Sequence, residues 1–288
     1  SDDQPQRRLK VLQVATIEFT VRVFLLPFGQ WFRDRGWHVD ALANGIESSA
    51  ECKAAYDTVF DSTWTRSPFS LSNFLTAPGI VRRVVEQGEY DIVHVHTPIA
   101  AFVVRWALRK RRREGKVAVV YTAHGFHFHE RGSRLKNSLF RGAEKLASRW
   151  TDLMVVLTPA DFDAALEQKV AVRERLRLIP GIGVDTERFD SASVSDSDVA
   201  ALRSELRIAH DDPVVLTVAR IAAGKCHDDM LRAVASLDRP VHTLLAGDGP
   251  LVDELKELAD SLGIGDRVHF LGHRTDVPTL MKASSVTV

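Results

Sequence analysis

Short apolar runs alternate along residues 9–157 with longer stretches in which apolar residues recur every three or four positions. A strand buried on both faces of a parallel sheet is a nearly continuous apolar run, whereas the wider spacing is typical of an amphipathic helix. The alternation predicts a parallel sheet covered by helices on both faces. The predicted strands are residues 9–15, 39–43, 91–96, 117–122 and 153–157, and the predicted helices are residues 23–35, 78–88, 100–113 and 135–150.

A second series of the same kind follows a polar interval. Residues 191–198 are rich in Ser and Asp and poor in apolar side chains, which indicates a domain boundary. We therefore expect an α/β protein with two Rossmann-like doubly wound domains, residues 1–190 and residues 191–288. In such folds a ligand binds outside the carboxyl ends of the strands. The second series has predicted strands at residues 214–219, 241–246 and 268–271, and predicted helices at residues 228–236 and 251–262.

The composition narrows the class of protein. The 288 residues suffice for two domains, and 38 Lys and Arg residues balance 38 Asp and Glu residues, so the overall charge indicates no nucleic-acid partner. Cys52 and Cys226 lie far apart without metal-site spacing, which favours a reducing, cytoplasmic compartment. No apolar run is long enough to cross a membrane, and residues 1–5 lack the apolar core of a signal peptide.

Two cations mark the most informative turn of the chain. Arg220 and Lys225 lie between a predicted strand and a predicted helix, on a turn that contains Gly224. Backbone N–H groups and the helix dipole favour an anion at such a place, and Arg and Lys can both bind a diphosphate. The alternative is two solvated cations on a surface turn. The location at the carboxyl end of a strand favours the diphosphate site.

A second turn of this type carries glycines. Gly247 and Gly249 follow a predicted strand, and Pro250 precedes a predicted helix. Glycines permit a tight turn and the close approach of a ligand. The same residues also fit a plain strand-to-helix turn with Pro250 at the first helical position. The turn is therefore weak support for a ligand site by itself.

Histidines gather at the end of the strand predicted at residues 117–122. His124 is placed at the expected crevice, where it can donate or accept a hydrogen bond, although a structural histidine is the usual alternative. His127 and His129 follow, but no matching set of carboxylates or cysteines accompanies them, so we expect no metal site. His94 and His96 share one face of a strand and are interpreted as structural or crevice-lining.

A cationic run, residues 109–113, closes a predicted helix that also carries Phe102 and Trp106. One interpretation is contact with an anionic membrane surface. The alternative is stabilisation of a helix C-terminus by cations, which the sequence slightly favours. The run remains a candidate for access to a lipid-linked substrate.

Taken in order, the motifs resemble those of a retaining family 4 glycosyltransferase of the GT-B fold, of the bacterial type that assembles exopolysaccharide, capsule or O-antigen. The resemblance covers nearly the whole chain, and the ordered set is more specific than any single motif. The motifs are DIVHVHTP at residues 91–98, YTAHGF at 121–126, IPGIGVDTERF at 179–189, VAR at 218–220 with Lys225, AGDGP at 246–250 and VHFLG at 268–272.

The resemblance implies a role for several residues. Arg220 and Lys225 match the pair that holds the donor diphosphate, and His124 matches the histidine near the transferred sugar. It implies a nucleotide-sugar donor with UDP as the nucleotide, and a lipid-linked or saccharide acceptor. It also implies no metal or other cofactor, because cations and helix N-termini offset the charge of the leaving diphosphate. Donor contacts are also implied for Gly247, Gly249, Gly272 and Arg274, and acceptor-side contacts for Thr16, Phe19 and Thr20.

The sequence departs from the family pattern at three places. Cys226 stands where the family usually has Gly, and the first loop lacks the common Gly-Gly pair. The family pattern continues past the position of Val288 into a helix with two glutamates that contact the donor sugar and ribose. The second domain is therefore expected to be incomplete, and this chain is expected to show weak or absent transfer.

We expect a sugar transferase located in the cytoplasm, at the inner face of the cell membrane, and make no prediction of its oligomeric state. Two alternatives stay open. One is a nucleotide-sugar epimerase of the same fold. The other is a non-catalytic nucleotide-sugar-binding subunit or an inactive fragment, because one fold serves many chemistries.

Overall fold

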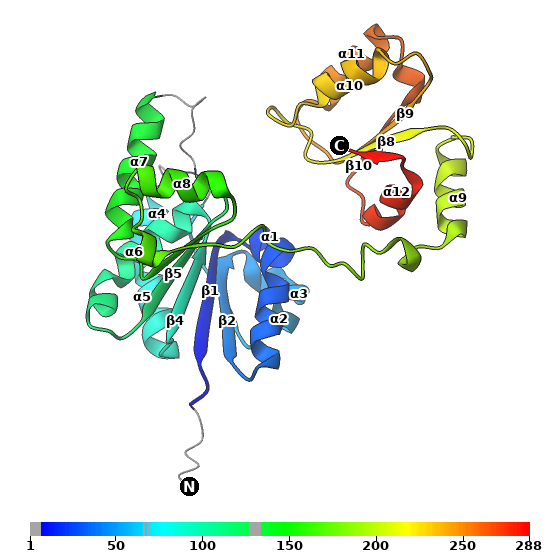
Figure 1. The fold of residues 1–288 in the computed structure, drawn as a ribbon. Helices are drawn as coiled ribbons and strands as arrows, with labels where there is room; N and C mark the ends of the chain where they lie inside the picture. The colour runs from blue at the N-terminus through cyan, green and yellow to red at the C-terminus, as the bar shows by residue number, and fades with distance from the viewer. Residues whose placement is uncertain (1–6, 66, 68–69, 127–133) are drawn as a thin grey trace. The chain divides into compact units, whose positions relative to one another are not determined.

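The computed structural model describes residues 7–65, 67, 70–126 and 134–288 (Figure 1). The chain divides into two compact units, Ser1–Gly183 and Val184–Val288. The boundary expected from composition, between residues 190 and 191, lies shortly after this division.

Unit 1 is built on a parallel sheet of seven strands in the order β3-β2-β1-β4-β5-β6-β7. Strand order reverses between β1 and β4, so these two neighbours form the topological switch point of the unit. The strands are β1 (Lys10–Ile17), β2 (His38–Asn44), β3 (Val59–Asp61), β4 (Ile92–His96), β5 (Ala118–Ala123), β6 (Leu153–Val156) and β7 (Leu176–Leu178).

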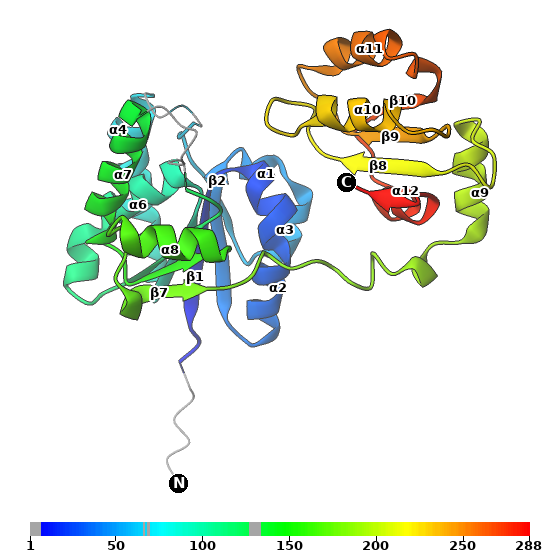
Figure 2. The same ribbon diagram turned by 45° about the horizontal axis from the view of Figure 1, so that its top comes forward.

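Helices cover both faces of this sheet, as Figures 1 and 2 show. Strand β1 contributes to both cores: Leu12 and Val14 belong to one apolar cluster, and Val11 and Ala15 to the other. Because successive side chains of a strand point to opposite faces, a strand buried on both sides is mostly apolar. The α-helices are α1 (Glu18–Thr20), α2 (Leu26–Asp34), α3 (Ala50–Ala55), α4 (Ser72–Leu75), α5 (Ala77–Gly88), α6 (Pro98–Arg113), α7 (Arg134–Ser148) and α8 (Pro159–Glu167); the short turns are η1 (Val21–Leu25), η2 (Ile46–Ser48) and η3 (Arg173–Arg175).

Unit 2 repeats the arrangement on a smaller scale. Its four strands are parallel, in the order β10-β9-β8-β11, so its switch point lies between β8 and β11. Apolar clusters lie on both faces, one including Leu202 and Leu280, the other Leu231 and Leu255. The elements are β8 (Val214–Val218), β9 (His242–Ala246), β10 (Val268–Gly272), β11 (Val286–Thr287), α9 (Asp196–Glu205), α10 (His227–Ala235), α11 (Val252–Ser261), α12 (Val277–Ala283), η4 (Ser191–Ser193) and η5 (Gly265–Arg267).

The first predicted helix begins earlier than its apolar spacing indicated. The chain is helical from Glu18 to Asp34, and residues 21–25 adopt a π-helical turn in place of the α-helical one. Pro27 follows this turn and has no N–H for an intrahelical bond, which interrupts the regular ladder. The predicted end is confirmed: Gly36 has φ 80° and donates its N–H to the Arg33 carbonyl.

A buried ion pair ties α6 to α7 in unit 1. Arg105 is 0% exposed and donates to Glu144 at 2.9 Å, while its guanidinium lies 4.2 Å from the ring centroid of Tyr121 on β5. Arg105 also donates to the carbonyl of Ala101. A buried charge needs such partners, because an unpaired one has a large cost of lost hydration.

Candidate functional site

Arg220 follows strand β8 at the switch point of unit 2, on a backbone that is fixed on both sides. Ala219 donates its N–H to the carbonyl of Ala246 at 3.1 Å, and Ile221 donates to the carbonyl of Asp248 at 3.0 Å. Both acceptors belong to β9 or to the turn that follows it. The two bonds leave Arg220 between two anchored neighbours, while its own side chain is exposed.

Gly247 and Gly249 allow the turn after β9 to pack directly against the turn after β8. A Cβ on Gly247 would lie 1.9 Å from the carbonyl oxygen of Ala219, and a Cβ on Gly249 would lie 1.9 Å from that of Ile221. Any other residue would force the two turns apart. Gly247 also donates its N–H to the carbonyl of Gly272 at 2.7 Å, which joins the end of β10 to the same cluster. The ends of β8, β9 and β10 thus form one hydrogen-bonded platform.

Lys225 lies on the turn between this platform and helix α10. Its side chain is exposed, and within the described part of the chain neither Lys225 nor Arg220 has a carboxylate partner. Helix α10 begins at His227, and the side chain of its N-cap residue, Cys226, makes no capping hydrogen bond to the first N–H groups. Burial lowers the pKa of His227, Asp228 opposes this, and the charge of Lys225 lowers it further.

Cys226 adopts a backbone conformation that explains the glycine usual at its position in the resembling family. Its φ and ψ are 52° and 34°, in the left-handed region that glycine enters without strain. A Cys side chain in this region is uncommon. The departure from the family pattern therefore leaves the turn intact and adds an exposed thiol beside Lys225.

Arg274 is held by acids of its own unit. Its Nε donates to Asp276 at 2.7 Å, and its Nη1 lies 3.6 Å from Glu205. The hydrogen bond with Asp276 raises the pKa of Arg274, and the same bond lowers the pKa of Asp276. The Arg274 guanidinium is therefore already paired with two carboxylates of unit 2.

In unit 1 the ends of β1 and β4 are joined by two hydroxyl groups at the switch point. Thr16 donates its N–H to Oγ1 of Thr97 at 3.0 Å, and the two Oγ1 atoms lie 2.7 Å apart. The Thr97 hydroxyl donates to the carbonyl of His96. Thr16 was predicted as a site residue and Thr97 was not, although a Thr-Pro pair directly after a strand marks its position.

Thr97 itself has a strained backbone. Its φ is 67° and its ψ is 134°, an unusual conformation for a β-branched residue. Pro98 begins helix α6 directly after it. Strain of this kind persists only where surrounding contacts impose it, and it clusters at functional sites.

Three histidines lie in contact beside this pair of threonines. His96 Nδ1 lies 3.1 Å from His124 Nε2, and His94 Nε2 lies 2.8 Å from Oγ1 of Thr122. The His94 and His96 ring centroids are 4.2 Å apart. Burial lowers the pKa of His94 to about 4 and holds that of His96 well below its usual value. Burial also lowers the pKa of His124, so the three rings are neutral at pH 7.

The segment that follows β1 lies close to these three histidines. Phe24 has its ring centroid 6.5 Å from that of His124, on the helical stretch that begins after β1. Phe19 is 44% exposed with Arg22 stacked 5.6 Å from its centroid, and Thr20 is half-buried. The structure thus brings Thr16 into the switch-point contacts and leaves Phe19 on the surface. His127 and His129 lie outside the described residues.

The cationic run at the end of α6 is partly engaged with neighbouring elements. Arg112 contacts Asp152 at 2.8 Å and donates to the Arg149 carbonyl, and Arg111 lies 3.7 Å from Glu86. These contacts fit the helix-end interpretation, while membrane contact stays a prediction. In the ranges that the structure describes, no helix has the length and apolarity to cross a membrane, and no three His, Cys, Asp or Glu side chains are arranged to hold a metal.

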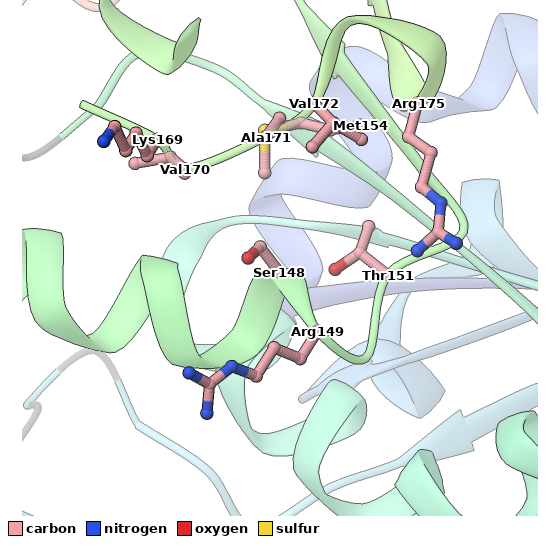
Figure 3. Close-up of a pocket in the computed structure, with 9 residues that line it drawn as sticks. All are labelled: Ser148, Arg149, Thr151, Met154, Lys169, Val170, Ala171, Val172 and Arg175. Atoms are coloured by element: carbon pink, nitrogen blue, oxygen red, sulfur yellow. The ribbon is translucent and has the colours of Figure 1, made fainter. Parts of the chain in front are cut away.

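A pocket of about 220 Å³ lies near the amino-terminal ends of β6 and β7, whereas Thr16 and Thr97 follow or end strands at their carboxyl ends (Figure 3). Its lining includes Arg149, Lys169 and Arg175, but their charged groups point in different directions and do not meet (Figure 3). The apolar part of the lining comes from Met154 and residues 170–172. A shared anion site therefore has no geometric support here.

Two doubly wound units, one with a cationic turn at its switch point, define the class of GT-B proteins. Residues 21–188 match the model of Glycosyltransferase Family 4, and residues 198–288 match that of Glycosyl transferases group 1. The chain belongs to the family 4 glycosyltransferases.

Individual relatives agree with this assignment. A putative glycosyltransferase EpsD of Bacillus subtilis is 34% identical over 97% of this chain and 72% of its own length. An Escherichia coli UDP-Gal:alpha-D-GlcNAc-diphosphoundecaprenol alpha-1,3-galactosyltransferase is 26% identical over 72% of this chain and 53% of its own length. Several other curated relatives are matched over less than half of their length, for example 42% of a Nocardia farcinica D-inositol 3-phosphate glycosyltransferase.

Solved structures share the fold. Anabaena Alr3699/HepE in complex with UDP has a TM-score of 0.76 at 24% identity, over 97% of this chain and 73% of that chain. WaaG, a glycosyltransferase involved in lipopolysaccharide biosynthesis, has a TM-score of 0.67 at 17% identity, over 97% of this chain and 74% of that chain.

Proposed function

We propose that this protein is a transferase that moves a sugar from a UDP-linked donor to a lipid-linked or saccharide acceptor in the synthesis of a cell-surface polysaccharide, with retention at the anomeric carbon. Family membership supports the reaction class. The donor class is supported by the UDP in the name of the E. coli relative and by the UDP bound to Alr3699/HepE. The acceptor class is supported by the diphosphoundecaprenol in the relative's name and by the EpsD similarity.

The observation that carries the proposal is the anchored backbone of Arg220 with its exposed guanidinium. A donor diphosphate needs cations that are already in place, because fixed charges stabilise the leaving group without reorganisation. Arg220 offers two parallel N–H donors to phosphate oxygens, and Lys225 offers a mobile ammonium. The uncapped start of α10 adds backbone N–H groups beside Lys225. This charge stabilisation is proposed to serve without a metal or other cofactor.

The roles proposed for unit 1 rest on its switch point. His124 would position the reacting sugar, and the loop that holds Thr16, Phe19 and Thr20 would face the acceptor. A lipid-linked acceptor would place the enzyme at the inner face of the cell membrane. Lys110 and Arg113, both exposed on the last turn of α6, would then contact anionic lipid.

Donor binding tests the proposal directly. Calorimetric titration with UDP should show Arg220→Ala and Lys225→Ala each binding at least about tenfold more weakly, since a charge-assisted hydrogen bond contributes about 1.5–3 kcal/mol. Arg239→Ala is the matched control. Arg239 is an exposed arginine of the same unit, and it precedes the amino end of β9, whereas Arg220 follows the carboxyl end of β8. UDP affinities that stay within twofold of the unaltered chain in both site variants would refute the diphosphate site.

Product analysis separates the remaining candidates. Incubation with a UDP-sugar and no acceptor should yield no epimerised sugar nucleotide, whereas an epimerase would produce one. A chain that binds UDP and transfers no sugar to any acceptor tested, but supports transfer once a second chain is added, would instead be a binding subunit.

A further inference from the structure

His96 is buried beside His124, and only one of its ring nitrogens has a partner. Nδ1 of His96 lies 3.1 Å from Nε2 of His124. Nε2 of His96 is buried, and among the described residues it has no hydrogen-bond partner. The side chain as a whole is 4% exposed.

These contacts decide which nitrogen of His96 carries its proton. A neutral imidazole has one N–H donor and one acceptor nitrogen. If Nε2 carried the proton, His96 would bury an unpaired N–H, whereas protonation at Nδ1 pairs its single donor with His124. Unpaired buried N–H groups are rarer than unpaired acceptors. The proton of His96 is therefore on Nδ1.

The position of the proton on His96 determines which nitrogen of His124 carries a proton. Since Nδ1 of His96 donates, Nε2 of His124 must accept and cannot carry a proton. A neutral His124 then carries its proton on Nδ1, the nitrogen that does not face His96. His124 is exposed at the end of β5, so this N–H is available to a ligand.

We propose that His96 is a positioning residue that fixes His124 as the Nδ1–H tautomer, so that His124 meets its substrate as a hydrogen-bond donor to a sugar oxygen. The position of the proton follows from unit 1 alone, and only its effect on sugar transfer rests on the function proposed above. Thr97 and His94 also contact His96 and hold it in place. Thr97 bonds the His96 carbonyl, and the ring of His94 packs 4.2 Å from that of His96, which limits rotation of the His96 side chain.

The tautomer is measured directly by long-range ¹H–¹⁵N spectra of the full chain with ¹⁵N-labelled histidine at pH 7. His124→Gln, which lacks the signal, assigns the resonance. The expected result is a protonated Nδ1 and an unprotonated Nε2 for His124. A protonated Nε2 would overturn the proposal whether or not the chain transfers sugar.

Two variants of similar size test the role of His96. His96→Asn keeps an N–H donor near the place of Nδ1, and His96→Leu removes it. The Asn variant is expected to rescue both the His124 tautomer and kcat to within about threefold. The Leu variant is expected to lose the tautomer preference and about tenfold in kcat with little change in KM, which corresponds to one lost hydrogen bond in the transition state.

The outcomes distinguish this proposal from the proposed function. UDP affinity should be the same in both variants, because Arg220 and Lys225 belong to unit 2. Unchanged Nδ1 protonation of His124 in a folded Leu variant would refute the role of His96 even if transfer is observed. If the Leu variant fails to fold, the spectrum of the unaltered chain and that of the Asn variant still decide the question.

Discussion

Gly249 lies against the carbonyl of Ile221 so closely that a Cβ on Gly249 would be 1.9 Å from its oxygen. The contact belongs to the platform that anchors Arg220, so its disruption should affect both stability and donor binding. It also explains why a Gly-Asp-Gly-Pro turn, which is weak support in sequence, is a structural requirement.

Gly249→Ala should lower the free energy of unfolding of unit 2 by about 1–3 kcal/mol, the usual cost of overpacking, and should weaken UDP binding. Chemical denaturation followed by circular dichroism, with hydrogen exchange of β8 and β9, measures this. Gly142→Ala is the control, and it should change the free energy of unfolding in the opposite direction. Gly142 lies in α7, and a Cβ there would meet no atom within 4 Å, so the change should stabilise by about 0.5–1 kcal/mol. Equal effects of the two changes would contradict the packing argument.

Arg220→Lys should lose most of the UDP affinity that Arg220→Ala loses. The charge is kept, but a lysine cannot present the two parallel donors of a guanidinium. The expected loss is about tenfold by calorimetry at constant salt. A variant that binds as tightly as the unaltered chain would show that only charge matters at this position.

Acidification should destabilise unit 1 through its buried histidines. His94 has a pKa of about 4 in the folded chain and about 6.5 when exposed, so the unfolded state binds more protons between these values. The free energy of unfolding should therefore fall as pH falls from about 6.5 to about 4, by at most about 3 kcal/mol for His94.

Tryptophan fluorescence during urea denaturation reports this unit selectively, because all five tryptophans, residues 31, 37, 64, 106 and 150, lie within it. His94→Gln should flatten the pH dependence, with the other two histidines supplying what remains. A pH dependence identical to that of the unaltered chain would contradict the assignment.

Glu144→Gln should destabilise unit 1 by about 3 kcal/mol, because it leaves the buried charge of Arg105 without its counter-charge. Adding Arg105→Met should recover part of that loss. Glu114→Gln is the surface control. Glu114 pairs with Lys116 where the two side chains are 35% and 58% exposed, so this change should have little effect on the free energy of unfolding. The same fluorescence measurement compares all three, and a Glu144 effect as small as the surface one would refute the argument.

The apolar pattern predicted the long central elements and missed the short ones at the edges. Strands β1 and β4 are largely buried, and they were predicted within two residues of their observed bounds. Strands β3 and β7 have three residues each, and only Leu176 of β7 is buried, so neither strand produces an apolar run in the sequence. Strand β11 has two residues, both exposed, and no apolar run in the sequence predicted it.

The sequence predicts candidate site residues that follow a strand, and it does not predict residues that act through other residues. Arg220 and His124 stand directly after apolar strands, where a ligand is expected. His96 was placed on its strand, but its neighbour His124 is 28 positions away and only the register of β4 with β5 joins them. Thr97 was missed because its strained φ depends on contacts with β1, which no local pattern contains.

The bond between Thr16 and Thr97 has a geometric consequence for unit 1. At a switch point the crossover connections leave in opposite directions, so no connection covers the gap between the two strand ends. The hydroxyl pair bridges that gap, so side chains and not a chain crossover hold the two strand ends together.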